Sequence, residues 1–390
     1  MREKKRIAIL GSTGSVGTQA LEVLEQYTQY FDIQLLSANS NVDLLAEQTR
    51  KHRPTSVVVC DESRYEKLSS LLGDVAVNIY SGMDALGEIV QSDHVDLVLI
   101  SLVGYAGLLP TMNAIKSGKE IALANKETLV VAGELIKSLS GEYQAPIYPV
   151  DSEHSAIYQC LIGEENNRVE KIYLTASGGP FLSYSSEQMG KVTKDQALKH
   201  PNWNMGNKIT IDSASLMNKG LEAIEARWLF DLEPAQIDVI IHPQSIIHSI
   251  VQFEDGSMKA QMGLPDMKLP ILYALTAPDR LKTNFKRFNF EDFSRLTFEK
   301  PDLKRFPNLF MAYESMKAGG NMPCVLNAAN EVSVEAFLKD KIGFLQMSEI
   351  VEQTMNKMDY IRNPNLEDYI QTDKKTRVLA RSLISKKVER

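Results

Sequence analysis

The chain has 390 residues, of which 44% are hydrophobic and 24% charged, and its formal net charge is −7 at pH 7. This length exceeds what one hydrophobic core usually serves, so two or three domains are expected, and no apolar run approaches the roughly 18 residues of a membrane span. Basic residues are scattered apart from two short terminal clusters, which argues against a nucleic-acid partner.

The three cysteines, Cys60, Cys160 and Cys324, are far apart in sequence and form no CxxC pair. This spacing argues against a zinc knuckle or a disulfide framework, so we expect buried thiols. The opening residues MREKKR resemble the start of a signal peptide, but the apolar segment that follows, Ile7 to Leu10, is too short for one and predicts a strand. We therefore expect a cytoplasmic protein.

The first predicted strand, Arg6 to Leu10, leads into the turn GSTGSVG and then into a helical pattern. Glycines let a backbone approach a pyrophosphate, and the N-terminus of the following helix adds N–H donors. The GxxGxxG spacing differs from the GxGxxG of the dinucleotide fingerprint, so the turn alone is a weak signal.

A second predicted strand, Ile33 to Ser37, ends in Ala38-Asn39-Ser40-Asn41. NAD enzymes usually carry an acidic residue here for the ribose hydroxyls. Because Asn39, Ser40 and Asn41 can instead donate to a 2′-phosphate, this loop favours NADP. A simple polar loop is the alternative.

Further strands are predicted at Ser56 to Cys60, Val95 to Ile100 and Glu120 to Leu123, with helical stretches between them. This alternation is typical of a doubly wound parallel sheet of the α/β class. The segment Asn125-Lys126-Glu127 follows the last of these strands, at the sheet edge where ligands bind. A solvated charge pair at a helix start is the alternative.

Asp151 and Glu153 are two residues apart in a segment predicted to be extended, so their carboxylates point to the same side. Together with Glu222 they would form an all-oxygen site, which selects Mg²⁺ or Mn²⁺ over zinc. An exposed acidic turn is the alternative.

Two segments are predicted to be loops that contact a ligand. The strand Val169 to Thr175 runs into Ser177-Gly178-Gly179-Pro180-Phe181, a turn whose amides and Ser177 hydroxyl suit an anion, although it could be only a turn. His200 to Gly206 lacks periodicity but contains Trp203 and Met205, which a lid over a substrate would explain. Packing on the domain's own core is the alternative.

The stretch from Asp212 to Trp228 predicts a helix that starts just after Asp212 and Ser213 as cap candidates. Asn218, Glu222 and Glu225 then share one face, beside an apolar stripe. The hydroxyls of Ser213 and Ser215, the Asn218 amide and the Lys219 ammonium suit a phosphate dianion, and Glu222 suits a hard cation. A phosphorylated, metal-chelated substrate is indicated, with a capped amphipathic surface helix as the alternative.

The C-terminal half predicts a second sheet and then helices. Strands are expected at Ile237 to Ile241, Ile246 to Phe253 and Ser257 to Gln261, with a hairpin at Asp255-Gly256. Ala277 to Asn308 is expected to be a long connection pinned to a surface by its aromatic residues. Helical periodicity at Leu309 to Lys317, Cys324 to Leu338, Met347 to Met358 and Lys374 to Val388 predicts a small bundle. The expected domains are residues 1–150, 151–277, 278–308 as a linker, and 309–390.

Eight segments, in this order, resemble the 1-deoxy-D-xylulose 5-phosphate reductoisomerase family: GSTGSVG, LANKE, PVDSEH, SGGPF, HPNW, MNKGLEAIEARW, HPQSIIHS and NAANE. The resemblance covers nearly the whole chain. It implies an NADPH domain, a catalytic domain whose sheet helps to form a homodimer, a linker and a helical C-terminal domain. The implied activity is the metal- and NADPH-dependent isomerisation and reduction of 1-deoxy-D-xylulose 5-phosphate to 2-C-methyl-D-erythritol 4-phosphate in non-mevalonate isoprenoid synthesis.

The resemblance also implies roles for individual residues, with Lys126, Glu153, His200 and Glu222 as the expected catalytic group. The divalent cation, Mg²⁺, Mn²⁺ or Co²⁺, is held by Asp151, Glu153 and Glu222. The substrate phosphate is held by Ser177, Ser213, Asn218 and Lys219. The reacting end of the substrate contacts Ser152 and Lys126, and the closing loop contributes His200, Trp203 and Met205. NADPH contacts Thr13, Gly14, Ser15, Val16, Asn125, Glu127 and Gly206.

One departure from the family pattern concerns the cofactor. Family members often carry Gly-Lys-Asn where this chain has Asn39-Ser40-Asn41, so the lysine expected near the 2′-phosphate is absent. Weaker discrimination against NADH, or a substitute basic residue, is expected.

Two rival functions compete with the one that this resemblance implies. A simple NADP-dependent dehydrogenase with a cysteine nucleophile would share the glycine turn, but neither Cys160 nor Cys324 lies in a turn with a partner histidine. A non-catalytic nucleotide-binding sensor would leave the three carboxylates and the phosphate-binding residues without a role.

Overall fold

A computed structural model describes residues 3–203 and 205–388, which divide into two compact units. Unit 1 comprises the chain up to Thr128 together with Ile136–Ser155 and Met267–Phe285. Unit 2 comprises Leu129–Leu135, Ala156–Asp266 and the chain from Lys286 onward. The structure divides the chain into two compact units, and the finer division into four segments expected from the sequence stays a prediction.

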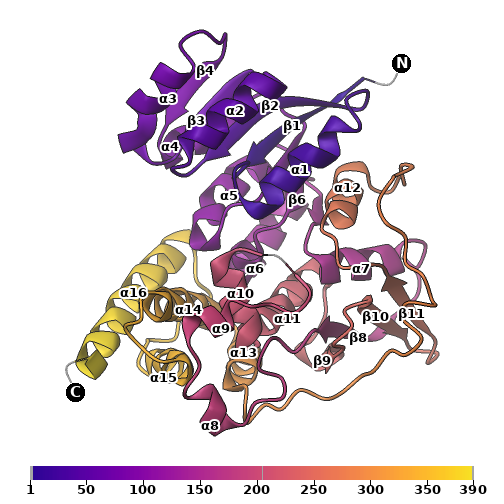
Figure 1. Ribbon diagram of the computed structural model, residues 1–390, viewed down its shortest axis with the longest axis vertical. Coiled ribbons are helices and arrows are strands. Elements are labelled where there is room, and N and C mark those ends of the chain that lie inside the picture. The colour runs from indigo at the N-terminus through magenta and orange to yellow at the C-terminus, as the bar shows by residue number, and fades with distance from the viewer. Residues whose placement is uncertain (1–2, 204, 389–390) are drawn as a thin grey trace. The chain divides into compact units, whose positions relative to one another are not determined.

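Unit 1 is a parallel sheet with helices on its faces (Figure 1). Its seven strands are in the order β4-β3-β2-β1-β5-β6-β7. The strands are β1 (Lys5–Leu10), β2 (Phe31–Ala38), β3 (Ser56–Val59), β4 (Asn78–Ser81), β5 (Leu97–Ile100), β6 (Glu120–Leu123) and β7 (Ile147–Pro149). The strand order reverses between β1 and β5, and in such sheets the crevice at that point binds ligands. The predicted doubly wound α/β sheet is confirmed, although β4 and β7 were not predicted.

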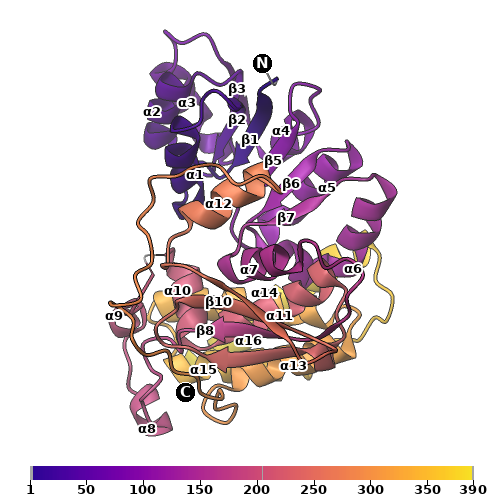
Figure 2. The same cartoon turned by 90° about the vertical axis from the view of Figure 1, so that its right-hand side faces the viewer.

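The helices of unit 1 follow the strands and cover the sheet. They are α1 (Ser15–Glu25), α2 (Val42–His52), η1 (Glu62–Arg64), α3 (Tyr65–Leu71), α4 (Met83–Ile89), η2 (Gly104–Gly107), α5 (Leu108–Lys116), α6 (Lys126–Glu142), α7 (Ser152–Leu161) and α12 (Lys268–Thr276). The segment Leu129–Leu135 of α6 and the part of α7 from Ala156 onward belong to unit 2. Figure 2 shows α12 beside α1, where Lys268 pairs with Glu22 at 2.7 Å.

The glycine turn after β1 is shaped by a close backbone approach. A Cβ placed on Gly17 would lie 2.3 Å from the carbonyl oxygen of Gly11, so a side chain cannot be accommodated there without movement. Ser12 Oγ donates to the Ser37 carbonyl and to Gln48 Oε1, which ties the turn to the end of β2. The start of α1 is thereby held at the carboxyl end of the sheet.

Unit 2 contains a four-stranded sheet in the order β11-β10-β8-β9, in which β8 and β9 are parallel and the other pairs antiparallel. Its strands are β8 (Val169–Ala176), β9 (Ile237–Ile241), β10 (Ile247–Phe253) and β11 (Met258–Met262). Its helices are α8 (Ser186–Met189), α9 (Lys194–Ala197), α10 (Asn207–Ala214), α11 (Met217–Phe230), η3 (Pro234–Gln236), α13 (Pro307–Ala318), α14 (Met322–Leu338), α15 (Phe344–Met355) and α16 (Leu366–Val388). The second sheet, its hairpin and the C-terminal helices were predicted correctly to within a few residues, except that α16 begins eight residues before the predicted Lys374.

Three local predictions were wrong or incomplete. Asp212 and Ser213 do not cap one long helix, because they end α10, and α11 begins only after Leu216 takes a left-handed φ of 57°. The segment after Asp151 is not extended, because Ser152 starts α7. The connection from Ala277 is irregular up to α13 and is pinned only in part by its aromatic residues: Phe285 packs against a core and Phe298 stacks on His242, but Phe290 is 73% exposed.

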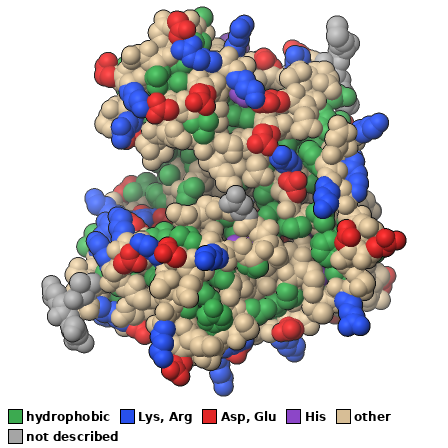
Figure 3. Space-filling view, viewed as in Figure 1, with side chains coloured by type: hydrophobic (Ala, Val, Ile, Leu, Met, Phe, Trp, Pro, Cys, Tyr) green, Lys and Arg blue, Asp and Glu red, His purple; other side chains and the backbone are tan. Residues whose placement is uncertain are grey.

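Surface features agree with the composition. Charges of both signs are interspersed on the face drawn in Figure 3. Every helix within residues 3–203 and 205–388 is too short or too polar to cross a lipid bilayer.

His242 and the three cysteines have structural roles. His242 Nε2 accepts the N–H groups of Ile246 and Ile247, and the cysteines are free and at least half-buried.

Gly220 in unit 2 tests how closely α11 and α13 pack, and Gly141 in unit 1 serves as its control. A Cβ on Gly220 of α11 would lie 2.4 Å from the Cβ of Ala312 on α13, whereas a Cβ on Gly141 of α6 meets nothing within 4 Å. We expect Gly220→Ala to lower the free energy of unfolding by about 1–3 kcal/mol through overpacking. Gly141→Ala should raise it by up to about 1 kcal/mol through helix propensity. Urea unfolding followed by circular dichroism measures both, and equal effects of the two substitutions would contradict the packing described here.

Candidate active site

Unit 1 presents one lysine and two carboxylates at the carboxyl end of its sheet. Lys126, the first residue of α6, pairs with Asp151 Oδ2 at 2.5 Å, and both side chains are largely buried. The ligand oxygens of Asp151 and Glu153 lie within 4.8 Å of each other, and Ser152 Oγ donates to Glu153 Oε2 at 2.6 Å. The Lys126 ammonium therefore offsets the negative charge of a carboxylate pair suited to a hard cation.

Asn125 fixes the start of α6. Its Oδ1 accepts the N–H of Thr128, and its Nδ2 donates to the carbonyls of Leu102 and Gly104 at 2.9 Å and to Glu127 Oε2 at 3.1 Å. These bonds hold the loop after β5 against the loop after β6. The side-chain amide of Asn125 is engaged on both sides, and the NADPH contact predicted for this residue stays a prediction.

The remaining predicted cofactor residues of unit 1 border the same edge of the sheet. Gly14 is the N-cap of α1, whose first residues are Ser15 and Val16, and this helix N-terminus lacks a side-chain cap. Asn39 and Ser40 are exposed at the end of β2, and Asn41 Oδ1 accepts the N–H of Leu44 at the start of α2. The predicted glycine turn and 2′-phosphate loop thus follow adjacent strands.

In unit 2, α11 carries the predicted phosphate-binding and metal-binding side chains on neighbouring turns. Lys219 Nζ contacts Glu222 Oε2 at 2.5 Å, and Asn218 Nδ2 donates to Glu222 Oε1 at 2.6 Å. Glu222 is fully buried and Lys219 nearly so. Both oxygens of the expected metal ligand are therefore held by the groups expected to bind phosphate.

The turn after β8 packs directly on the end of α10. A Cβ placed on Gly179, whose φ is 68°, would lie 2.8 Å from the carbonyl oxygen of Ser213, so the absence of a side chain permits this approach. It places the Ser177 turn against the Ser213 backbone. The two serines predicted to bind one phosphate are far apart in sequence, yet they belong to segments in contact.

His200 has a defined tautomer in unit 2. Its Nδ1 accepts the backbone N–H groups of Asn202 and Trp203 at 3.1 and 2.9 Å, so the proton of the neutral ring is on Nε2. Nε2 then donates to Ser177 Oγ at 3.1 Å. An N–H donor and a hydroxyl lie together, as binding of an anion requires.

The segment after His200 is anchored at its beginning. Asn202 Nδ2 donates to the Pro243 carbonyl and to Ser245 Oγ, and the Trp203 ring lies 6.2 Å from that of His248. Met205 is partly buried, and Gly206 is the N-cap of α10. Closure of this segment over a substrate stays a prediction.

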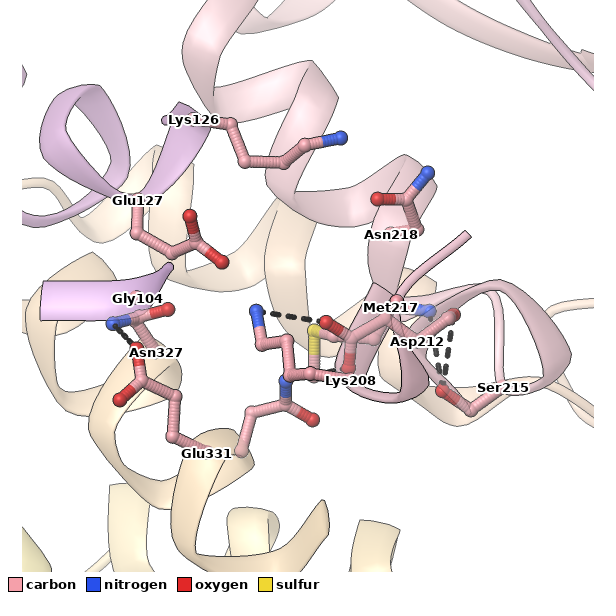
Figure 4. Close-up of polar contacts among 12 residues, drawn as sticks. Gly104, Lys126, Glu127, Lys208, Asp212, Ser215, Met217, Asn218, Asn327 and Glu331 are labelled. Atoms are coloured by element: carbon pink, nitrogen blue, oxygen red, sulfur yellow. Dashed lines mark hydrogen bonds and ion pairs between the residues drawn. The ribbon is translucent and has the colours of Figure 1, made fainter. Parts of the chain in front are cut away.

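The fold joins three polar residues that were not predicted as site residues, Lys208, Asp212 and Asn330, of which only Asp212 had a predicted role, as a helix cap. Asp212 Oδ2 pairs with Lys208 at 2.8 Å, as Figure 4 shows, and Asp212 Oδ1 accepts Asn330 Nδ2 at 2.8 Å. The i, i+4 spacing of Lys208 and Asp212 is a signal that was available in the sequence. Asn330 belongs to the segment NAANE noted above, but it lies 118 positions from Asp212, and the sequence does not reveal their contact.

The cysteines are poor nucleophiles. Burial raises the pKa of Cys60 and of Cys160 to about 11, and it raises the pKa of Cys324 further. At neutral pH all three are thiols rather than thiolates. This argues against the rival dehydrogenase with a cysteine nucleophile.

Comparison with known proteins gives consistent matches along the chain. Residues 7–133 match the family model described as 1-deoxy-D-xylulose 5-phosphate reductoisomerase, residues 147–230 match its C-terminal domain model, and residues 262–379 match the model of the DXP reductoisomerase C-terminal domain. The 1-deoxy-D-xylulose 5-phosphate reductoisomerase of Phocaeicola vulgatus is 61% identical over 382 residues, covering 98% of this chain and 100% of the relative. That of Bacteroides thetaiotaomicron is 57% identical, covering 98% of both chains.

Solved structures agree with these matches. The enzyme of Zymomonas mobilis in complex with NADPH has a TM-score of 0.91 at 41% identity, with 98% of this chain and 99% of that chain covered. A DOX-P reductoisomerase in complex with NADPH, fosmidomycin and magnesium has a TM-score of 0.92 at 40% identity, with 98% of each chain covered.

The pairing of Lys219 with Glu222 predicts that phosphate and cation bind cooperatively. A phosphate that draws Lys219 and Asn218 away would free both Glu222 oxygens, so inorganic phosphate should tighten Mg²⁺ binding by about fivefold or more. Isothermal titration calorimetry with and without phosphate measures this. Lys219→Met should abolish the dependence, and Lys171→Met, which breaks the surface pair with Asp238, should keep it. Equal Mg²⁺ affinity with and without phosphate in the unmodified protein would contradict the coupling.

Proposed function

Since the chain belongs to the 1-deoxy-D-xylulose 5-phosphate reductoisomerase family, we propose that it converts 1-deoxy-D-xylulose 5-phosphate to 2-C-methyl-D-erythritol 4-phosphate with NADPH and a divalent cation. The observation that carries this proposal is the arrangement on α11, where the groups suited to phosphate hold the carboxylate suited to the cation. A phosphorylated substrate chelated by a metal needs both within one site.

The cation ligands we propose are Asp151 and Glu153 from unit 1 and Glu222 from unit 2. Their chemistry fits, because carboxylate oxygens are the ligands that Mg²⁺ and Mn²⁺ prefer, and each unit already pairs one of these carboxylates with a lysine ammonium. When bound, the cation polarises the ketone and hydroxyl oxygens of the substrate. Mn²⁺ and Co²⁺ are proposed as substitutes for Mg²⁺.

The other site residues have separate proposed roles in substrate binding and in stabilising charge. Ser177, Ser213, Asn218 and Lys219 grip the phosphate, which is remote from the reacting carbons, and this binding energy supports closure of the segment with His200, Trp203 and Met205. Lys126, released from Asp151, stabilises negative charge that develops on the substrate oxygen, and Ser152 hydrogen-bonds the same end. Closure excludes water while the carbon skeleton rearranges to a branched aldehyde.

The reduction completes the reaction. When bound, NADPH would supply the hydride that reduces the aldehyde carbon, and solvent water would supply the proton that completes the alcohol. We propose that the cofactor lies along the turn Thr13 to Val16, with Asn125, Glu127 and Gly206 as further contacts. The free helix N-terminus of α1 supports this placement, because it offers N–H donors to the pyrophosphate.

Assembly and location are also proposals. Within the described residues, the edge strand β11 pairs on one side only, with β10, and carries exposed Met258, which supports a homodimer formed through the second sheet. Three free cysteines and the absence of a CxxC pair support a reducing, cytoplasmic location.

Spectrophotometric measurement of NADPH oxidation in the presence of 1-deoxy-D-xylulose 5-phosphate tests the function. We expect turnover that requires Mg²⁺ or Mn²⁺, and Glu222→Gln should lower kcat/KM by at least about 100-fold because a cation ligand is lost. Glu233→Gln, an exposed carboxylate outside the site, is the matched control and should keep full activity. Folded protein that binds NADPH but fails to oxidise it with this substrate would refute the proposal.

The loop Asn39-Ser40-Asn41 predicts incomplete selectivity for NADPH. Because a lysine at position 40 would add a charge beside the proposed 2′-phosphate, Ser40→Lys should raise the NADPH to NADH ratio of kcat/KM by about tenfold. Ser40→Met, of similar length without charge, should leave the ratio unchanged. Steady-state kinetics with both cofactors measure the ratio, and equal gains in the two variants would speak against a 2′-phosphate at this loop.

A further inference from the structure

Helix α14 carries a buried asparagine whose amide contacts another helix. Most of α14 is buried and apolar, yet Asn330 is only 1% exposed. Its Nδ2 donates to Asp212 Oδ1 on α10 at 2.8 Å. A buried amide in an apolar helix costs stability unless it is hydrogen-bonded, so this contact fixes the rotamers of both side chains.

Asp212 is a buried carboxylate with two partners on opposite sides. It is 1% exposed, and its second oxygen meets Lys208 Nζ at 2.8 Å, one turn earlier on α10 (Figure 4). The free-energy cost of burying a carboxylate is offset by an opposite charge and by hydrogen bonds. If one partner is removed, the desolvation cost of the carboxylate is no longer offset. Asn330 and Lys208 together therefore determine where Asp212 lies.

Asp212 anchors the joint that carries the phosphate-binding groups. Ser213 follows it directly in the last turn of α10, and Leu216 then takes a left-handed φ of 57° before α11 begins. Ser215 Oγ accepts the Met217 N–H across this joint. Asn218 and Lys219 lie in the first turn of α11, so the position of Asp212 sets the spacing between the Ser213 hydroxyl and these two side chains.

We propose that Asn330 is a positioning residue for the substrate phosphate. Through Asp212 it holds the joint between α10 and α11, so that Ser213, Asn218 and Lys219 face one dianion. The C-terminal helical region thereby contributes to substrate affinity through a residue that contacts no substrate. This inference rests on the proposed function for the identity of the phosphate ester, but the geometry applies to inorganic phosphate as well.

The test compares Asn330→Ala with Asn321→Ala. Asn321 is an equally buried asparagine at the start of α14, and its Nδ2 donates to the Asp359 carbonyl and to Thr372 Oγ1, away from α10. Titration calorimetry gives the dissociation constant of inorganic phosphate, and steady-state kinetics give separate KM values for the phosphosugar substrate and for NADPH. Thermal unfolding reports the stability of each variant.

We expect Asn330→Ala to weaken phosphate binding and to raise the substrate KM by about tenfold, with less than a threefold change in kcat and no change in the KM for NADPH. Asn321→Ala should lower the melting temperature without changing phosphate affinity. Unchanged phosphate affinity in Asn330→Ala, or an equal loss in both variants, would overturn the proposal. Because phosphate binding is measured without turnover, the positioning role of Asn330 can be tested even if the protein does not catalyse the proposed reaction.

An exchange variant keeps the test valid if Asn330→Ala folds poorly. In Asp212→Asn combined with Asn330→Asp, the amide of Asn at position 212 can donate to the carboxylate at position 330 while its carbonyl still accepts from Lys208. We expect this double variant to recover phosphate affinity to within about threefold of the unmodified protein, whereas Asn330→Asp alone, with two carboxylates facing each other, should not. A double variant no better than Asn330→Asp alone would count against the positioning role.

Discussion

Two buried lysine-carboxylate pairs are the constraint on which the site depends. Lys126 pairs with Asp151 in unit 1, and Lys219 pairs with Glu222 in unit 2, each at 2.5 Å. A site that collects carboxylates for a cation would repel itself when empty, and the lysines neutralise that repulsion. In the proposed complex each lysine moves to a substrate anion, so charge stays balanced as the dication and the phosphate ester enter together.

The secondary structure around these pairs explains how the two lysine side chains are held in position. Lys126 is fixed because Asn125 bonds both to the loop after β5 and to the first turn of α6. Lys219 is fixed because α11 starts at a left-handed Leu216 and follows α10, whose end packs against the Gly179 turn. Donors held in place before the ligand arrives need little reorganisation on binding. Such preorganisation strengthens both ligand binding and transition-state stabilisation.

Much of this could be predicted from the sequence where the signal is local. The spacing of Asn218 and Glu222 places them on one helix face, and their observed hydrogen bond confirms it. The break at Leu216 was not predicted, because positive φ is uncommon for a residue other than glycine and a leucine gives no sequence signal for it. The helix starting at Ser152 was also missed, since an acidic pair two residues apart fits a strand equally well. The contact of Asn330 with Asp212 could not be predicted, although the segment NAANE was noted, because the two residues are 118 positions apart in sequence.

The most direct test of the central claim is the anomalous difference density of a crystal grown with Mn²⁺ and inorganic phosphate. We expect one strong peak coordinated by the carboxylates of Asp151, Glu153 and Glu222, with Lys219 moved from Glu222 to a phosphate oxygen and Lys126 moved away from Asp151. A strong Mn²⁺ peak bound elsewhere, or one at these carboxylates with both lysine pairs still intact, would contradict the exchange of partners proposed here.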